Sequence, residues 1–174
     1  MIPVSIMFGT AIIIGNVLGE GRAQIAMQYY RHAVFLGFLS TFLMLFFYCY
    51  FKDGIIRGFT NQPEAIAIVE RAWPVFLVFA FFDTIQLATS ATIRATMNMG
   101  IGSILSFTGY FVIGIPLAWF FAFHQGMGIT GIWIGPAFAC IYLFILYNVV
   151  IARIDLKALI DTIEERTRFE KEVK

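Results

Sequence analysis

The chain has 174 residues, of which 60% are hydrophobic, 17% aromatic and only 13% charged. Soluble domains carry about 25% charged residues, so this composition argues against a soluble protein and indicates a membrane protein. The formal net charge is +1 and the sequence has no basic tract, which argues against a nucleic-acid-binding surface.

Five apolar stretches follow one another along the chain and predict a multi-pass transmembrane helix bundle of the all-α class. A helix that crosses a bilayer needs about 20 mostly apolar residues, and the last four stretches reach that length. The first is shorter and starts at the initiating methionine without a polar cap, so we expect a span whose first turns are missing. The stretches are 1–18, 30–51, 72–93, 101–123 and 129–151.

Local signals mark helix ends and contacts within this pattern. Pro63 and Glu64 predict a helix start in the longest connecting segment, 52–71, because proline suits the first helical turn and glutamate suits the helix dipole. Pro116 removes a backbone donor inside an apolar span and predicts a bend there. Gly131 and Gly135 are one turn apart and would let another helix approach closely.

The basic residues predict the orientation of the chain. Nine of the 12 Lys and Arg residues fall in the first loop, the third loop and the C-terminal tail, and three fall in the opposite loops. Since Lys and Arg accumulate on the cytoplasmic side, we expect a cytoplasmic C-terminus. Residues 1–152 would form the bundle. Residues 153–174 would form a charged, amphipathic cytoplasmic helix on the membrane surface, or alternatively a partner-binding helix.

No catalytic pattern occurs in the sequence. It has no G-x-x-x-x-G-K-S/T phosphate loop, no H-E-x-x-H and no G-x-S-x-G, and its two histidines, His32 and His124, are far apart. Cys49 and Cys140 are isolated in apolar runs without metal or disulfide spacing, so we expect them to be packing residues. We therefore expect neither an enzyme nor a bound cofactor or metal.

Asp83 is an acidic residue near the middle of a predicted span, about ten residues or 15 Å of helix from either end. A charge at that depth costs at least about 2.5 to 3.5 kcal/mol, which a partner, a water-filled cavity or protonation must offset. Gln86, Thr89 and Ser90 continue a polar stripe on roughly the same face. Asp83 is thus either a cation or proton site, or a neutral acid that holds helices together. Arg94 marks the end of the span, where its side chain can reach the headgroups.

Taken in order, four segments resemble the multidrug and toxic compound extrusion (MATE) family of transporters. "MIPVSIMFGTAIIIGNVLGEGRAQIA" resembles the eighth helix and the loop that follows it, and "FFDTIQLATSATIRA" resembles the tenth-helix motif. "GYFVIGIPLAWFFAF" is similar to the eleventh helix and "GITGIWIG" to the start of the twelfth. The resemblance covers residues 1–152 and implies part of the C-terminal half of a MATE-type fold, helices eight to twelve.

The resemblance also implies a function. Members of the family rock two six-helix bundles against each other in the lipid bilayer and export organic, often cationic, compounds in exchange for H⁺ or Na⁺. Asp83 falls where many members carry an intramembrane acid that handles cation and substrate. Gln86, Ser90, Tyr110 and Trp133 are further candidates for the cation or substrate cavity, Tyr110 through its aromatic ring.

Several positions depart from the family pattern. Ala95, Met97 and Met99 stand where the family usually has Gly, Gly and Gln, Ser106 replaces an Asn, and Ile13 replaces an Arg. The N-terminal helix bundle of the family has no counterpart in the chain. We expect an antiporter of the plasma membrane or of a vacuolar or other internal membrane. The alternative is a non-transporting truncated protein, or a small subunit whose partner supplies the missing helices.

Overall fold

The computed structural model describes residues 2–95 and 99–153, and each element in these ranges is helical. The predicted all-α class is thereby confirmed, while the predicted tail helix lies outside the described residues beyond Arg153. The α-helices are α1 (Ile2–Gly19), α2 (Ala23–Tyr50), α3 (Lys52–Phe59), α4 (Pro63–Ala95), α5 (Met99–Phe107), α6 (Ile115–Trp119) and α7 (Ile129–Arg153). Two segments are π-helical, η1 (Thr108–Gly114) and η2 (Phe120–His124). In the order α5, η1, α6 and η2, these four segments form one continuous helix.

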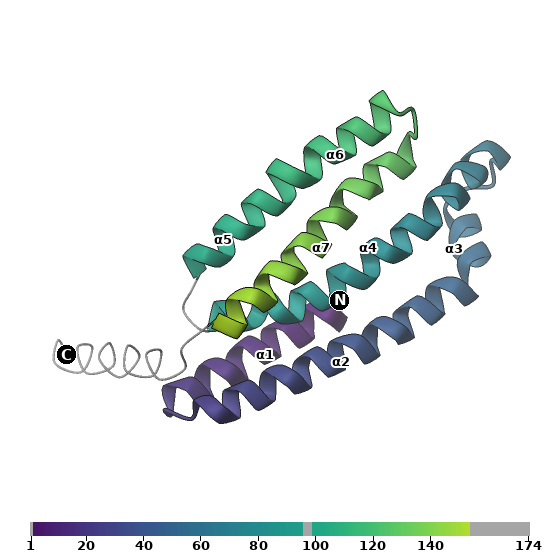
Figure 1. Cartoon of the computed structure of the whole chain (residues 1–174). Coiled ribbons are helices and arrows are strands. Elements are labelled where there is room, and N and C mark those ends of the chain that lie inside the picture. The colour runs from purple at the N-terminus through teal and green to yellow at the C-terminus, as the bar shows by residue number, and fades with distance from the viewer. Residues whose placement is uncertain (1, 96–98, 154–174) are drawn as a thin grey trace, which may run out of the picture.

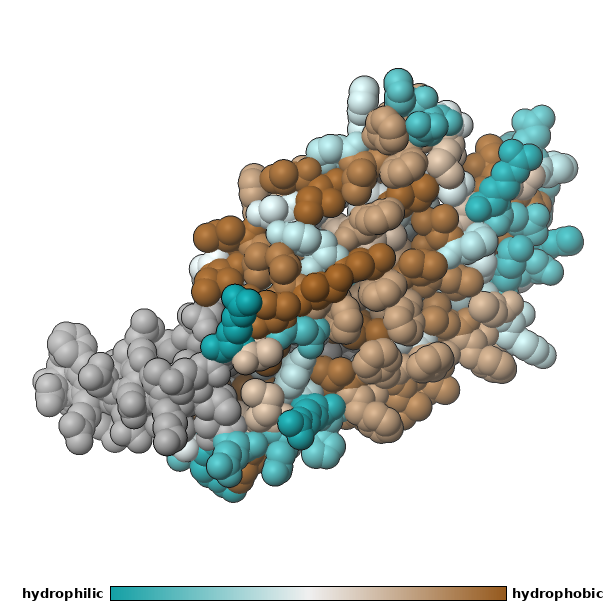
Figure 2. Space-filling view, in the orientation of Figure 1, coloured by the Kyte–Doolittle hydropathy of each residue, from teal (hydrophilic) through white to brown (hydrophobic). Residues whose placement is uncertain are grey.

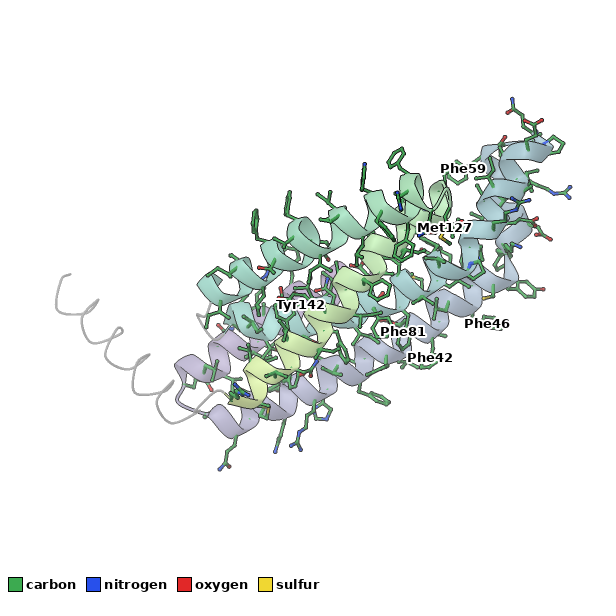
Figure 3. The ribbon with its side chains drawn as sticks, turned by 45° about the horizontal axis from the view of Figure 1, so that its top comes forward. Phe42, Phe46, Phe59, Phe81, Met127 and Tyr142 are labelled. Carbon is green, nitrogen blue, oxygen red and sulfur yellow. The ribbon has the colours of Figure 1, made fainter. Side chains whose placement is uncertain are left out.

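The long helices run along a common axis, with α4 and α7 at the centre (Figure 1). The helix α4 packs against α1 and α2 on one side and against α7 on the other, and α7 also packs against η1, α6 and η2. Between α2 and α4, Phe42 and Phe81 meet edge to face with their ring centroids 6.2 Å apart (Figure 3). The centre of the bundle therefore lies along α4 and α7, which carry the candidate site.

Among residues 2–95 and 99–153, four helices are long and apolar enough to cross a membrane: Gln24–Tyr50, Pro63–Ala95, Gly100–His124 and Ile129–Arg153. They correspond to the four full-length predicted spans, and the first predicted span is the shorter apolar helix Phe8–Gly19. Apolar residues cover the middle of the face in Figure 2, and hydrophilic residues gather at the two ends. Large side chains such as Phe46, which is 70% exposed, point outward. Such a surface is suited to lipid tails.

The connecting segment 52–71 contains more helix than the apolar pattern predicts. The helix α4 begins at Pro63 with Glu64 in its first turn, which confirms the predicted start but places it well before the apolar stretch. The ion pair of Lys52 Nζ with Glu70 Oε1, at 3.3 Å, holds α3 against this extension. With 33 residues, α4 is about 50 Å long, so it extends beyond the hydrocarbon core, which is about 30 Å thick.

Pro116 is accommodated by a change in helical winding. At the end of η1 the Ile115 N–H donates to Tyr110 O, five residues back. The helix is therefore wound more widely just before Pro116, the residue that has no N–H to donate. The chain continues as one helix to His124. It then turns into α7 through Gly126 and Gly128, both of which have positive φ, a conformation that glycine adopts without strain.

The contacts of α6 and η2 with α7 depend on glycine, as the spacing of Gly131 and Gly135 predicts. A Cβ built on Gly131 would lie 2.6 Å from Ala122 Cα, and one on Gly135 would lie 2.6 Å from Ala118 Cβ. Both glycines are buried. In lipid, where apolar burial does not drive helices together, such close backbone approach supplies the van der Waals contact that holds them.

The substitution Gly135→Ala tests this close contact. The added methyl group would overlap Gly114 O and crowd Ala118, so we expect the free energy of unfolding to fall by about 1 to 3 kcal/mol, the usual cost of overpacking. Denaturant unfolding of the purified protein in lipid measures it. The matched control is Gly9→Ala in α1, where nothing lies within 4 Å of the new Cβ and helix propensity favours alanine. Equal stability of the two variants would contradict the close approach.

Candidate functional site

Asp83 lies at the centre of a polar cluster built from three helical segments. Its Oδ1 accepts hydrogen bonds from Gln86 Nε2 at 3.4 Å and from Cys140 Sγ at 3.7 Å. Gln86 Nε2 also donates to Tyr110 Oη at 3.1 Å, and Tyr110 Oη lies 3.7 Å from Cys140 Sγ. These four residues, which we call the acid cluster, therefore form a closed ring of contacts.

The local fold brings these side chains together. Asp83 and Gln86 are three residues apart on α4 and so lie on the same face of the helix. Tyr110 comes from η1 and Cys140 from α7. The segment η1 can approach α7 because Gly109 has no side chain: a Cβ there would lie 3.0 Å from Leu143 Cγ. The acid cluster is thus a product of helix packing rather than of one sequence motif.

The charge of Asp83 has no basic partner in the described part of the chain. The ion pairs found among residues 2–95 and 99–153 are Arg22 with Glu20, in the turn between α1 and α2, and Lys52 with Glu70, which joins α3 to α4. Asp83 itself is half-buried. A carboxylate in this position needs a cation, a proton or water to offset its desolvation. Within the same ranges no group of three His, Cys, Asp or Glu side chains could hold a metal ion.

A pocket of about 490 Å³ adjoins the acid cluster, and Tyr110 belongs to both. Since the helix that begins with α5 runs antiparallel to α4 (Figure 1), the pocket extends from Arg94, in the last turn of α4, towards Tyr110. Arg94 marks the end of α4 as predicted. The pocket is lined by Ser90, Ile93, Arg94, Gly102, Ser103, Ser106, Phe107, Tyr110, Phe111 and Tyr147.

A second set of hydroxyl groups lies along the wall of the pocket. Ser106 Oγ donates to Gly102 O at 2.9 Å and lies 2.7 Å from Tyr147 Oη. Tyr147 is buried and seven residues beyond Cys140 on α7, so both project from the same face. In the sequence, Ser106 is marked only as a departure from the family pattern, and Tyr147 is not marked at all. The heptad spacing of Cys140 and Tyr147 was the signal available.

The structure places three of the five predicted site residues in the acid cluster and the other two outside it. Asp83, Gln86 and Tyr110 share the acid cluster. Ser90 lines the pocket, while its hydroxyl donates to Leu87 O within its own helix. Trp133 instead joins an aromatic group, with its ring centroid 5.2 Å from those of both Phe76 and Phe79.

Cys140 is the residue of the acid cluster that the sequence did not single out. It is fully buried, as expected of a packing residue. It also contacts the carboxylate of Asp83 and the hydroxyl of Tyr110, which a packing role alone does not describe. An isolated cysteine in an apolar run carries no signal of its polar neighbours, because those neighbours come from other helices.

Comparison with known proteins identifies the family. Residues 1–120 match the family model described as MatE. The chain belongs to the MatE family. It is 28% identical to rat "Multidrug and toxin extrusion protein 1" over 159 residues and 31% identical to human "Multidrug and toxin extrusion protein 2" over 164 residues. Each alignment covers 90% of this chain but only 28% and 26% of the relatives, so the chain spans about a quarter of their length.

A solved structure shows the same fold. The crystal structure of the eukaryotic MATE transporter AtDTX14 superposes with a TM-score of 0.88 at 22% sequence identity, covering 95% of this chain and 37% of that one. The membrane helices and the family together identify a multi-pass membrane protein of the MATE type. This confirms the resemblance drawn from the four sequence segments.

The two cysteines should differ in reactivity in the native membrane. Cys49 is exposed near the end of α2, and Cys140 is buried. Because only an accessible thiol reacts, we expect a maleimide to modify Cys49 alone in the folded protein and both residues after unfolding. Mass spectrometry of the labelled chain measures this, and Cys49→Ser should abolish the native label. Labelling of Cys140 in the folded protein would contradict its burial in the acid cluster.

Proposed function

We propose that this chain forms part of an antiporter that exports organic, often cationic, compounds in exchange for H⁺ or Na⁺, and that Asp83 binds the coupling ion. The observation that supports this most strongly is a carboxylate within α4 that has a polar cluster around it but no basic partner in the described ranges. A structural acid would be neutralised permanently, whereas an unpaired one can exchange cations. The names of the rat and human relatives, which specify multidrug and toxin extrusion, agree with this function.

Coupling would follow from competition for one negative charge. With H⁺ or Na⁺ bound, the carboxyl group of Asp83 is neutral overall and holds no organic cation. Once that ion leaves, the carboxylate attracts the cationic group of the substrate. Gln86 keeps the carboxylate in place through its amide, and the Tyr110 ring offers a face to an organic cation. Ser90 and Trp133 remain predicted contributors to the substrate cavity, although both lie outside the acid cluster.

Alternating access requires a second group of helices. In transporters built from two repeats, one bundle moves against the other around a site near the middle of the membrane. This chain spans about a quarter of the length of its relatives. We propose that an N-terminal bundle, on the same polypeptide or on a partner subunit, completes the transporter. We further propose that the side at which α4 ends, with Arg94, is cytoplasmic, in the plasma membrane or an internal membrane.

The helices of the proposed N-terminal bundle can be detected by mass spectrometry of the native protein. We expect the native protein, solubilised from its own membranes and captured through an antibody against the region of residues 153–174, to contain at least seven apolar spans beyond those of this chain. Intact-mass and peptide analysis of the captured complex measures this. Recovery of the 174-residue chain alone, together with an absence of transport, would instead support the non-transporting alternative.

The substitution Asp83→Asn tests the role of the carboxylate. It removes the charge and preserves the shape, so we expect gradient-driven efflux of a fluorescent organic cation to fall at least about tenfold, because an interaction with a charged group contributes about 1.5 to 3 kcal/mol. Efflux from membrane vesicles containing the complete protein measures the rate. Asp53→Asn, at an exposed acid in the first turn of α3, is the matched control and should transport normally. Undiminished transport by Asp83→Asn would remove Asp83 from the mechanism.

A further inference from the structure

A continuous chain of hydrogen-bonding groups leads from the pocket to Asp83. Tyr110 lines the pocket, its hydroxyl lies 3.7 Å from Cys140 Sγ, and Cys140 Sγ lies 3.7 Å from Asp83 Oδ1. These distances are within the range of hydrogen bonds that involve sulfur. Three helical segments, η1, α7 and α4, each contribute one group to this path.

The donors and acceptors along the path leave one consistent arrangement of hydrogens. The single thiol hydrogen of Cys140 is donated to Asp83 Oδ1. The hydrogen between Tyr110 and Cys140 must then come from the tyrosine hydroxyl. Gln86 Nε2 donates to that same hydroxyl oxygen, which leaves the hydroxyl hydrogen directed at sulfur. Tyr110 and Cys140 can each accept one proton while donating another, as a proton relay requires.

We propose that Tyr110 and Cys140 relay protons between the pocket and Asp83. A hydronium ion in the pocket gives a proton to Tyr110 Oη, the hydroxyl proton of Tyr110 passes to Cys140 Sγ, and the thiol proton of Cys140 passes to Asp83 Oδ1. One O–H bond breaks at hydronium and one forms at Asp83, both relay groups end with one proton each, and no electron is transferred. The relay rests on the proposed function, since it supplies the coupling ion to the same carboxylate.

The pocket is suited to hold the water that feeds the relay. Its volume of about 490 Å³ is well above the minimum of about 10 to 15 Å³ that a cavity needs to hold one water molecule, so the pocket has room for several. Ser90 and Ser106 use their hydroxyl hydrogens on Leu87 O and Gly102 O. The oxygen of Ser90 can then accept hydrogen bonds from water, and the oxygen of Ser106, which also contacts Tyr147 Oη, keeps one lone pair for water. With Arg94 at the end of α4 predicted to be cytoplasmic, the relay exchanges protons with the cytoplasmic side.

The surroundings of Asp83 suit a proton better than a metal cation. A hard cation prefers a shell of several oxygen ligands, but the groups that contact Asp83 are the amide nitrogen of Gln86 and the thiol of Cys140. Tyr110 and Cys140 are the titratable groups that face Asp83 from η1 and α7 in the described ranges. In the described parts of α1, α2 and α7, no basic side chain forms an ion pair with Asp83.

The rate at which Asp83 gains a proton tests the relay without any transported substrate. The complete protein in lipid nanodiscs is subjected to a rapid fall in pH, and the infrared band of the protonated carboxyl group, identified by its loss in Asp83→Asn, is followed in time. We expect Cys140→Ala and Tyr110→Phe to slow the appearance of this band by about 100-fold, the lower end of what a positioned proton-transfer group contributes.

Three further measurements separate a relay from a purely structural role. Cys140→Ser keeps a group that accepts and donates, so it should retain the fast rate, and deuterium oxide should slow the wild type. Cys49→Ala and Tyr142→Phe, which change the same residue types outside the path, should behave as the wild type. The relay is overturned if Cys140→Ala and Tyr110→Phe protonate at the wild-type rate, if Cys140→Ser is as slow as Cys140→Ala, or if no carboxyl band changes.

The outcomes for the relay and for the proposed function are distinguishable. Loss of transport in Asp83→Asn together with wild-type protonation in Cys140→Ala and Tyr110→Phe would keep the proposed function and reject the relay. Undiminished transport in Asp83→Asn together with slow protonation in the two relay variants would reject the proposed role of Asp83 in coupling and keep the proton path to it.

Discussion

The negative charge of Asp83 inside a membrane-spanning helix is the constraint on which the rest of the site depends. An unpaired carboxylate at this depth is costly, and among residues 2–95 and 99–153 no basic side chain pairs with it. Its neighbours are instead an amide from its own helix and a thiol from α7, with a phenol from η1 behind them. This environment holds the carboxylate in place, and under the proposed function an exchangeable ion would offset its charge.

Close helix packing makes this environment attainable. In lipid, helices gain little from burying apolar side chains, so small residues that allow backbones to approach supply much of the contact energy. Gly131 and Gly135 bring α7 against the α6 region, and Gly109 brings η1 against Leu143. The same approach places Tyr110 and Cys140 within reach of Asp83. The packing of the bundle and the chemistry of the site therefore have a common structural basis.

The proposed relay connects this site with the pocket and assigns separate tasks to its neighbours. Gln86 orients the carboxylate and the phenol, since its amide nitrogen contacts both. Tyr110 and Cys140 would move the proton, and Asp83 would hold it until substrate competes for the charge. Trp133 takes no direct part in this scheme, because its ring packs against Phe76 and Phe79.

Features that arise within one helix could be predicted from the amino-acid sequence. Hydrophobic length located the spans, Pro63 located the start of α4, and the spacing of three residues placed Gln86 beside Asp83. Ordered motifs identified the family. The partners that come from other helices were decided only by the tertiary structure: Cys140 joined Asp83, Tyr147 joined Ser106, and Trp133 was placed among aromatic rings. The physical reason is that helical periodicity defines which residues share a face, whereas the depth and rotation at which two helices meet depend on the packing of the whole bundle.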